Sequence, residues 1–407
     1  MHSDMNCFYA SVEMMLKPTL KGKAVAVCGS TEDRHGIVLA KSEKAKKAGV
    51  KTGMINSEAK RICSDLILVE PHYDQYMKFS RMAHEIYYRY TDLVEPFGMD
   101  ECWLDVTDCQ KFIGSPEEIA EKIRNDIKNE LGLTVSIGVS FNKIFAKLGS
   151  DMKKPDAITI ITPDDFKEKV WPLPAGDLLY CGEATSKKLY SYGIETIGEL
   201  AGTRPDFLRR LLGVDGLKLL SYANGTDSSR VMHKSYSSPV KSVGHGITCR
   251  ADLETKEEVS KVILELSQDV GHRLRVNSLK AANVEIYIRG KDLSPEHYSS
   301  SLSSPSMLPC DIAKAAADEF NKRYLWLTPV RSVTVRATNL KSSSECVQLN
   351  LFADYKREEN MERVEKAIEN IRSRFGKKAI TYASLLGDLK MPGDDRDMVK
   401  MPGMMYV

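Results

Sequence analysis

Acidic residues interrupt two apolar, strand-like segments of the sequence, and this feature constrains the fold more than any other. Asp4 lies in Ser-Asp-Met-Asn-Cys-Phe-Tyr, and the adjacent Asp100 and Glu101 lie in Phe-Gly-Met-Asp-Glu-Cys-Trp-Leu-Asp. Carboxylates at such positions are costly to bury unless they are paired or hold a cation. On neighbouring strands, the single aspartate and the Asp-Glu pair can bind two Mg²⁺ ions about 4 Å apart. The alternative is that these acids are ordinary strand-end or turn residues.

Short strands and helices are mixed through the first part of the chain. Apolar or alternating runs predict strands at 25–28, 37–40, 97–106 and 133–139. Helical patterns lie at 42–49, 73–91 and 116–131, the last after a Ser-Pro-Glu-Glu start. Residues 173–227 have the pattern of short helices separated by glycines. This mixture predicts an α/β or α+β core followed by a small helical module.

The second part of the chain begins with a polar stretch at 228–240, which predicts an exposed linker. Beyond it, the run 282–289 places Val284, Ile286 and Ile288 on one face and polar residues on the other, as in a sheet with one wet face. Helical patterns lie at 256–275 and 311–323, and one more strand lies at 330–337. Together with the run 282–289 they complete a β-α-β-β-α-β order that resembles a split βαβ domain. A helix is expected over 359–375 and a disordered tail over 390–407.

Composition limits the compartment and the partners. The chain has 407 residues, which at roughly 100 to 200 residues per domain suggests two to four domains. Its 58 Lys and Arg nearly balance its 56 Asp and Glu, so any basic binding surface must be local. Nine cysteines without a Cys-x-x-Cys pair argue against a structural zinc site and a disulfide framework, and favour a reducing cytoplasm. No apolar run approaches the ~20 residues that span a bilayer and the start lacks a signal region, so we expect neither membrane insertion nor export.

Several motifs in register resemble the Y-family DNA polymerases. The segments are Asp4-x-Asn6-x-Phe8-Tyr9-Ala10-Ser11-Val12-Glu13, Gly98-Met99-Asp100-Glu101-Cys102-Trp103-Leu104-Asp105-Val106-Thr107, Ser140-Phe141-Asn142-Lys143, Phe145-Ala146-Lys147 and Asp151-x-x-Lys154-Pro155. Their order and spacing match the family from the first residue to about residue 352. The resemblance implies an α+β multidomain fold, a right-hand polymerase with palm, small fingers, helical thumb and a split βαβ little finger.

The resemblance also implies limits for these domains. The palm is expected over 1–7 and 72–163, and the fingers over 8–71. The thumb, with a helix-hairpin-helix, is expected over 164–230, and a linker at 231–240 leads to a DNA-binding little finger at 241–347. A clamp-binding motif at 348–352 and a C-terminal helix with a disordered tail over 353–407 complete the chain.

The resemblance assigns the catalytic metal ligands. They are Asp4, Asp100 and Glu101, with the carbonyl of Met5 as a further ligand, and the implied cofactor is Mg²⁺, two ions per active site. With several motifs in register, the resemblance favours this assignment over strand-end acids. Only three residues precede Asp4, fewer than a full first strand usually has, so a truncated start is an alternative.

Four residues are expected to bind the incoming nucleotide: Phe8, Tyr9, Lys46 and Lys154. Tyr9 stands where the family has its sugar-sensing aromatic, and a ring packed against the deoxyribose would clash with a 2′-hydroxyl. Phe8 has the alternative of a core aromatic. Lys154 resembles the family lysine that meets the triphosphate as a point charge, with a solvated turn residue as the alternative.

Two positions depart from the family pattern. Most members have a Tyr and an Arg in the segment Ser-Tyr-Glu-Ala-Arg, where this chain has Ser42-Glu43-Lys44-Ala45-Lys46. Lys46 can supply charge without a bidentate fork, and Glu43 cannot replace the phenol. Asn6 replaces a frequent Asp, a change that resembles the polymerase V catalytic-subunit branch.

DNA-binding residues are expected in two places. Gly182 and Gly193 belong to turns that resemble a helix-hairpin-helix pair, which presents backbone N–H groups to a DNA phosphate. The first hairpin glycine of that pattern is Tyr180 here, and plain helix packing is the alternative. In the last domain, polar and basic residues are expected to track a duplex backbone, with a merely solvated face as the alternative: Lys241, Arg250, Arg289, Ser332, Thr334 and Arg336.

The segment Gln348-Leu349-Asn350-Leu351-Phe352 resembles the pentapeptide by which bacterial DNA-processing enzymes dock on the sliding clamp. Leu and Phe would fill an apolar pocket and Gln would set the register, so Gln348, Leu349, Leu351 and Phe352 are the expected clamp-binding residues. The alternative is a last core strand under the helix at 359–375.

The resemblance implies template-directed DNA synthesis of low fidelity that extends primers past damaged bases. The implied partners are primer-template DNA, dNTPs, the sliding clamp and accessory SOS proteins. One rival function is a nucleotidyl cyclase, which uses a similar two-metal palm but has no duplex to hold. Another is a clamp- or DNA-bound accessory factor that has lost catalysis, for which Asn6, Glu43 and the short start are the only support.

Overall fold

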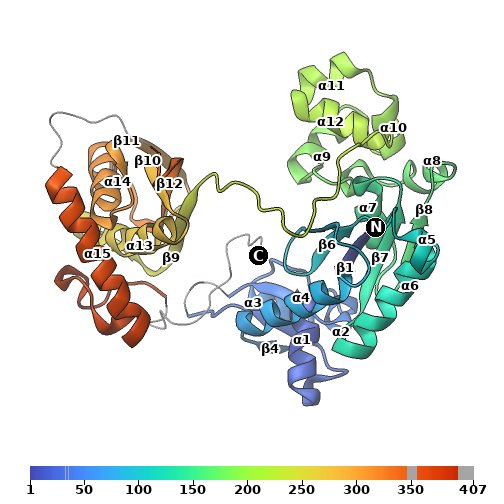
Figure 1. Cartoon of the computed structure of the whole chain (residues 1–407), viewed down its shortest axis with the longest axis horizontal. Helices are drawn as coiled ribbons and strands as arrows, with labels where there is room; N and C mark the ends of the chain where they lie inside the picture. Colours follow the sequence, from blue (N-terminus) through green and yellow to red (C-terminus); the bar gives the residue numbers. More distant parts are fainter. Residues whose placement is uncertain (33, 35, 346–354, 393–407) are drawn as a thin grey trace. The chain divides into compact units, whose positions relative to one another are not determined.

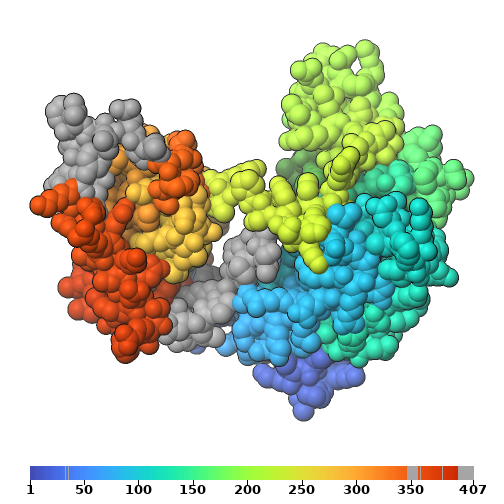
Figure 2. Space-filling view, viewed as in Figure 1, coloured from blue at the N-terminus to red at the C-terminus, as the bar shows by residue number. Residues whose placement is uncertain are grey.

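The computed structural model describes residues 1–32, 34, 36–345 and 355–392, which form two compact units (Figure 1). Of the described residues, those in 1–28 and 38–237 form the first unit, and those in 29–37 and 238–392 form the second. Figure 2 shows the chain in space-filling form, with the residues outside the described ranges in grey. Within these described ranges, no helix is both long enough and apolar enough to cross a bilayer.

A five-stranded sheet is the centre of the first unit. Its order is β5-β6-β1-β7-β8, and the β7–β8 pair is parallel while the other pairs are antiparallel. β1 and β7 are buried along nearly their whole length, as apolar strands are when both faces of a sheet are covered. The strands are β1 (His2–Met5), β5 (Val94–Pro96), β6 (Glu101–Leu104), β7 (Val135–Ser140) and β8 (Ile158–Ile161).

Helices cover both faces of this sheet (Figure 1). Successive residues of β1 point to opposite faces, and they contact different helices. The hydroxyl of Ser3 lies 3.0 Å from that of Tyr87 on α4, whereas Nδ1 of His2 lies 2.9 Å from Oγ of Ser150 on α7. The helices around the sheet are α4 (Tyr73–Tyr87), α5 (Gln110–Ile113), α6 (Pro116–Asp126) and α7 (Lys143–Met152).

The helix predicted at 116–131 is confirmed, and its ends follow from local chemistry. Ser115 accepts a hydrogen bond from the backbone N–H of Glu118, and the Glu118 carboxylate accepts one from the N–H of Ser115. After α6 the helix continues as a π-helical turn, Ile127–Leu131. It ends at Gly132, whose φ of +64° is the left-handed conformation that glycine adopts at little cost.

A smaller sheet and a helical module complete the first unit. The small sheet has the order β3-β2-β4. Its elements are α1 (Phe8–Leu16), β2 (Val25–Cys28), β3 (Val38–Lys41), α2 (Glu43–Lys47), α3 (Asn56–Ile62) and β4 (Ile67–Val69). After α8 (Phe166–Val170), the helical module predicted over 173–227 is confirmed as α9 (Glu183–Tyr190), α10 (Ile197–Gly202), α11 (Pro205–Leu212) and α12 (Val214–Ala223).

The second unit has the predicted β-α-β-β-α-β order, which is therefore confirmed. Its antiparallel sheet runs β11-β10-β12-β9, and α13 and α14 pack on the apolar face. On β10, Val284, Ile286 and Ile288 are 1 to 2% exposed, as the alternation predicted. The elements are β9 (Val243–Leu253), α13 (Lys256–Val276), β10 (Leu279–Gly290), β11 (Pro295–Ser306), α14 (Pro309–Arg323), β12 (Val330–Ser342) and α15 (Tyr355–Phe375).

Two sequence predictions need correction. The strand predicted at 97–106 is only Glu101–Leu104, because residues 97–100 make the turn of the β5–β6 hairpin and Gly98 there has φ +145°. The prediction of disorder from residue 390 is wrong for residues 390–392, because Lys390 pairs with Glu258 at 2.6 Å. Residues 226–242 contain neither helix nor strand, which agrees with a linker. The motif at 348–352 and residues 393–407 lie outside the described residues.

Candidate active site

The pairing of β1 with β6 brings the predicted carboxylates together. Asp4 lies opposite Glu101 across the two antiparallel strands. The backbone N–H of Met5 donates to the carbonyl of Asp100 at 2.9 Å, which holds the end of β1 against the start of β6. Asp4 is only 5% exposed. Acids that are almost 100 positions apart in the sequence therefore share one buried site.

Two lysines that follow β7 neutralise part of this charge. Nζ of Lys147 lies 3.3 Å from Asp4, 2.9 Å from Glu101 and 3.0 Å from Asp151. Nζ of Lys154 lies 2.7 Å from Asp4 and 2.9 Å from Asp151. The sequence predicted a functional role for Lys154 but assigned none to Lys147, although the i, i+4 spacing of Lys147 and Asp151 was a signal for an ion pair.

The charges of these acids are not fully balanced. Burial, followed by the charges of Glu101 and Asp4, raises the pKa of Asp100 to about 7. Burial also raises the pKa of Asp4, against the opposing effect of Lys154. The pKa of Glu101 is affected by burial, which raises it, but His2 and Lys147 outweigh that effect and lower it to about 2.

The donor set suits a divalent cation, although no side-chain cluster is already arranged around one. In the part of the chain that the structure describes, no three His, Cys, Asp or Glu side chains are grouped to hold a metal ion. Asp4 and Glu101 point to Lys147 instead. A divalent cation would favour the ionised form of Asp100, whose charge is opposed by its neighbours. Hard carboxylate oxygens are the ligands that Mg²⁺ prefers.

His2 is a buried neighbour of this site that the sequence analysis did not single out. Its Nε2 lies 3.4 Å from Glu101, and its Nδ1 lies 2.9 Å from the hydroxyl of Ser150. That hydroxyl donates to the carbonyl of Lys147 at 2.7 Å. Burial lowers the pKa of His2 to about 4, so the imidazole is neutral near pH 7. His2 thus lies between the Glu101 side chain and α7.

Asn6, the departure from the frequent family Asp, connects three segments of the site. Its amide nitrogen donates to the hydroxyl of Ser136 on β7 at 2.9 Å. Its amide oxygen accepts from the backbone N–H of Asp156 at 2.8 Å, two residues beyond Lys154. Because Asn6 follows β1 directly, these bonds tie the loop that carries Lys154 to the strand that carries Asp4.

Tyr9 belongs to a stack of aromatic rings, and Phe8 belongs to the core. The ring of Tyr9 stacks on Tyr76 with centroids 4.2 Å apart and an interplanar angle of 10°. Its hydroxyl donates to Sδ of Met99 at 3.4 Å, and burial, followed by the charge of Asp100, raises its pKa to about 12. Phe8 is 3% exposed, which favours its core alternative over nucleotide contact.

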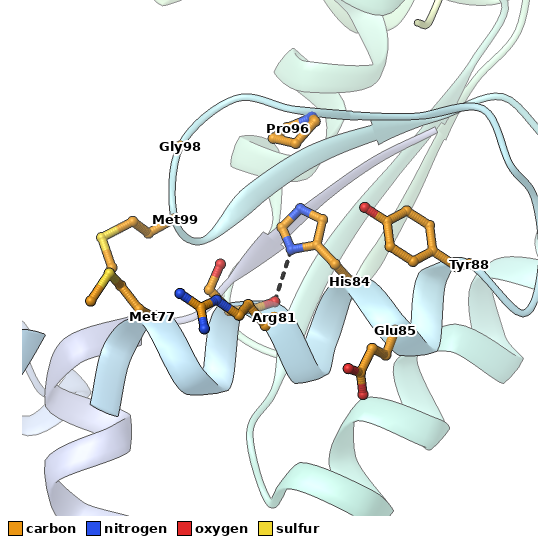
Figure 3. Close-up of a pocket in the computed structure, with 9 residues that line it drawn as sticks. Met77, Arg81, His84, Glu85, Tyr88, Pro96, Gly98 and Met99 are labelled. Atoms are coloured by element: carbon orange, nitrogen blue, oxygen red, sulfur yellow. Dashed lines mark hydrogen bonds between the residues drawn. The ribbon is translucent and has the colours of Figure 1, made fainter. Parts of the chain in front are cut away.

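A pocket of about 220 Å³ adjoins this stack, between α4 and the loop of residues 96–99 (Figure 3). Met77 and Met99 line one end, and the ring of His84 stands between the helix and the loop. Nδ1 of His84 is hydrogen-bonded to the carbonyl of Ser80 at 2.8 Å. Met99 is shared by the pocket and by the hydroxyl of Tyr9, so the packing of this loop supports the position of the Tyr9 ring.

The basic segment of α2 lies near the start of α1, but Lys46 is exposed. Its Nζ is 3.9 Å from Glu43. Glu43 also accepts a hydrogen bond from the thiol of Cys7 at 3.1 Å. Burial and this bond raise the pKa of Cys7 to about 12, so the thiol keeps its proton. Glu43 therefore has a defined place between the Cys7 thiol and Lys46.

Comparisons with known proteins identify the family. Residues 3–151 match the model of the impB/mucB/samB family, and residues 240–351 match the model of its C-terminal domain. DNA polymerase IV of Acetivibrio thermocellus is 47% identical over 388 residues, which cover 95% of this chain and 97% of that protein. DNA polymerase IV 1 of Bacillus subtilis is 38% identical over 391 residues, 95% of this chain and 92% of that protein. The chain belongs to the Y-family of DNA polymerases.

A solved structure supports the fold of this polymerase. The Y-family DNA polymerase chimera Dbh-Dpo4(243-245)-Dbh is similar with a TM-score of 0.74 at 23% identity, over 84% of this chain and 98% of that chain. The fold is a right-hand polymerase with palm, fingers, thumb and little finger, as the resemblance implied. The protein is a DNA-directed DNA polymerase, which excludes the nucleotidyl cyclase, and Y-family polymerases are metal-dependent in general.

The predicted DNA-contacting turns of the polymerase lie in its helical module. Gly182 is the residue before α9, and Gly193 has φ +74°. Tyr180, where the family pattern has a glycine, adopts φ +68° and is 65% exposed. A side chain in this conformation costs roughly 1–2 kcal/mol, so the turn keeps the glycine-like backbone without the glycine.

The predicted DNA-contacting residues of the little finger lie mostly on one face of its sheet. Ser332, Thr334 and Arg336 alternate with Val333 and Val335, which are fully buried. Arg289 pairs in register with Ser332 on the neighbouring strand. Lys241 is exposed before β9, and Arg250 on β9 lies 3.1 Å from Asp388.

The same face carries an acid that the sequence analysis did not include. Glu285 accepts a hydrogen bond from Tyr287 at 3.1 Å and lies 4.0 Å from Arg336. The ring of Tyr287 stacks on His297 with centroids 4.1 Å apart. The sheet face therefore combines positive charge with a fixed negative group.

Proposed function

We propose that this polymerase extends primers past damaged template bases by metal-dependent nucleotidyl transfer, in which the 3′-hydroxyl attacks a dNTP and pyrophosphate leaves. Asp4, Asp100 and Glu101 are the proposed ligands of two Mg²⁺ ions, with the carbonyl of Met5. The observation that carries the proposal is the strand pairing that sets Asp4 opposite Glu101 and next to Asp100. Mg²⁺ held by these oxygens would activate the hydroxyl and neutralise charge on the triphosphate.

The chain's own residues have separate proposed tasks around the nucleotide. Lys154, which lies at Asp4, would meet the triphosphate as a point charge. Tyr9, held by its stack on Tyr76, would pack against the deoxyribose and exclude a 2′-hydroxyl. Lys46 would add positive charge from the exposed side of α2, and Phe8 would support Tyr9 from the core.

Low fidelity would follow from the small size of the proposed fingers. Over residues 8–71 the strands have three or four residues and the α-helices have five to nine, so little material can enclose the nascent base pair. Base-pairing differences worth about 1 to 3 kcal/mol give roughly 10- to 100-fold selection before any check of shape. Room for a damaged base and weak selection against a wrong base thus have a common cause.

The proposed domain limits are those that the resemblance implies. The thumb, 164–230, would hold a DNA phosphate through the turns at Gly182 and Gly193. The little finger, 241–347, would follow the duplex backbone with Arg289, Arg336 and their neighbours, because its polar face alternates with a buried one. Docking of residues 348–352 on the sliding clamp, accessory SOS proteins as partners and a cytoplasmic location complete the proposal, and sequence alone supports them.

Primer extension tests the proposal. We expect Asp100→Ala and Glu101→Ala to lower extension on an undamaged template with Mg²⁺ and dNTPs more than about 100-fold, roughly 3 kcal/mol of barrier, with primer-template affinity changed only a few-fold. Asp108→Ala is the control, since Asp108 is exposed on the loop after β6. Asp100→Ala activity above a hundredth of the parent would contradict the metal assignment. A complete block at an abasic template site would contradict translesion synthesis.

A further inference from the structure

Lys147 lies where a cation shared by Asp4 and Glu101 would lie. Its Nζ is 3.3 Å from Oδ2 of Asp4 and 2.9 Å from Oε2 of Glu101, so one ammonium bridges carboxylates on two strands. The side chain is 12% exposed, which places the ammonium inside the site and not at its rim. The oxygens that face Lys147 are the oxygens that a shared divalent cation would need.

The carboxylates require such a counter-charge when no metal is bound. Asp4 and Glu101 are directly opposite each other on adjacent strands, and like charges so placed repel across the pair. Lys154 contacts Asp4 but not Glu101 among the ion pairs of the described residues, so it cannot bridge the two acids. Lys147 is the side chain that bridges them.

The same helix gives Lys147 a third partner, Asp151, in addition to Asp4 and Glu101. Asp151, one turn along α7, lies 3.0 Å from Nζ of Lys147 and is 47% exposed. A lysine has a flexible four-carbon stem and three donors, so it can exchange partners by rotation of its own side chain. If a divalent cation took the oxygens of Asp4 and Glu101, the ammonium of Lys147 would be repelled toward Asp151.

We propose that Lys147 is an internal counter-ion that holds Asp4 and Glu101 in place in the metal-free polymerase and keeps only Asp151 as its partner when divalent metal binds. Lys147 is therefore a positioning residue that competes with the metal. The proposal rests on the proposed metal site, and it predicts that removing the ammonium makes metal binding easier even though it destabilises the metal-free protein.

The test measures the thermal midpoint of the full chain without DNA or nucleotide, first in EDTA and then over a MgCl₂ titration at constant ionic strength. We expect Lys147→Met to lower the midpoint in EDTA by several degrees. We expect Mg²⁺ to raise the midpoint of this variant by more than it raises that of the parent, with half of the rise at a Mg²⁺ concentration at least threefold lower. Lys147→Arg, which keeps the charge and can hold both carboxylates with its fork, should need at least threefold more Mg²⁺ than the parent.

Lys143→Met is the matched control. Lys143 is on the same helix, is 13% exposed, and lies 2.7 Å from Glu95, an acid outside the carboxylate cluster. This variant should lose stability by the same amount in EDTA and in Mg²⁺. Equal Mg²⁺ responses of Lys147→Met, Lys143→Met and the parent would overturn the proposal. If Lys147→Met does not fold, an unchanged Mg²⁺ requirement of Lys147→Arg would overturn it.

The result separates this proposal from the metal assignment itself. If the parent shows no Mg²⁺-dependent rise, or a rise that Asp100→Ala retains, the proposed metal site is wrong. If the parent shows the rise and Asp100→Ala loses it, but the two Lys147 variants respond like the parent, the metal site stands and the counter-ion role is wrong.

Discussion

The ammonium of Lys154 lies 2.7 Å from Oδ2 of Asp4. The lysine expected to meet the triphosphate is therefore held at a proposed metal ligand before a nucleotide is present. The loop that carries it is fixed at Asp156 by Asn6 from one side and by Arg124 and Lys128 from the other. The ammonium of Lys154 is thus already in position when a nucleotide binds.

Lys154→Ala should raise the KM for dNTP about 10- to 100-fold, because it removes a point charge expected at the triphosphate. It should also lower the thermal midpoint, because the buried Asp4 loses its partner at 2.7 Å. Steady-state primer extension at varied dNTP measures this change. Lys153→Ala is the control, since Lys153 is exposed beside it. Equal effects of the two variants would show that Lys154 has no specific contact with the triphosphate.

Asp100→Asn should stabilise the metal-free polymerase, and increasingly so as the pH rises. Burial, with Glu101 and Asp4, raises the pKa of Asp100 from 3.8 to about 7. Between these values the unfolded chain has released a proton that the folded protein retains, so stability falls as the pH rises through this window and levels off above it. Thermal midpoints in EDTA should therefore agree near pH 4 and differ most above pH 7, with Asp108→Asn as the control. A lower midpoint for Asp100→Asn at pH 8 would contradict the unfavourable burial of this charge.

Tyr9→Ala should increase rNTP incorporation relative to dNTP by at least tenfold, because the ring that would meet a 2′-hydroxyl is removed. Tyr9→Phe should retain sugar selection, since it keeps the stack on Tyr76 and loses only the hydroxyl contact to Met99. Single-nucleotide incorporation with each nucleotide type gives the ratio. Unchanged selectivity in Tyr9→Ala would place the sugar check at another residue.

Asn6→Ala should raise the KM for dNTP about tenfold, because the loop that carries Lys154 loses a hydrogen bond to β1. One buried and one partly buried hydrogen bond disappear, each worth about 1 kcal/mol, so the thermal midpoint should also fall. The side chain of Asn6→Asp can still accept a hydrogen bond from the N–H of Asp156. Its KM for dNTP should therefore lie close to that of the parent. Asn125→Ala, which loses an exposed amide, is the control. An Asn6→Asp variant as impaired as Asn6→Ala would contradict the positioning role.

Leu351→Ala combined with Phe352→Ala should abolish stimulation of synthesis by the sliding clamp and leave synthesis without the clamp intact. Each side chain can bury an apolar surface worth roughly 1.5 to 3 kcal/mol in a partner pocket. Primer extension with and without clamp, together with the thermal midpoint, separates this outcome from the core-strand alternative. That alternative predicts equal losses in both assays and a lower midpoint.

Some elements of the fold were predicted correctly from the sequence, and one strand was predicted too long. The capping residues Ser115 and Glu118 and the alternation of Val284, Ile286 and Ile288 predicted a helix and a strand that the structure contains. The strand at 97–106 was predicted too long, because the alternation of apolar residues continued through a hairpin turn. The assignments of Tyr9 and the DNA-contacting residues stay predictions.

By itself, the sequence determined several strands and helices, the β-α-β-β-α-β order of the second unit, the acids of the candidate site and the family, because periodicity, capping and motif spacing are local properties of the chain. Only the tertiary structure decided which charges meet. The pairing of β1 with β6 and the packing of α7 place Lys147, Lys154 and His2 around Asp4 and Glu101. No local pattern contains these contacts, because they join residues between 46 (Glu101 and Lys147) and 150 (Asp4 and Lys154) positions apart. The raised pKa of Asp100 has the same origin, since burial and neighbouring charges exist only in the folded chain.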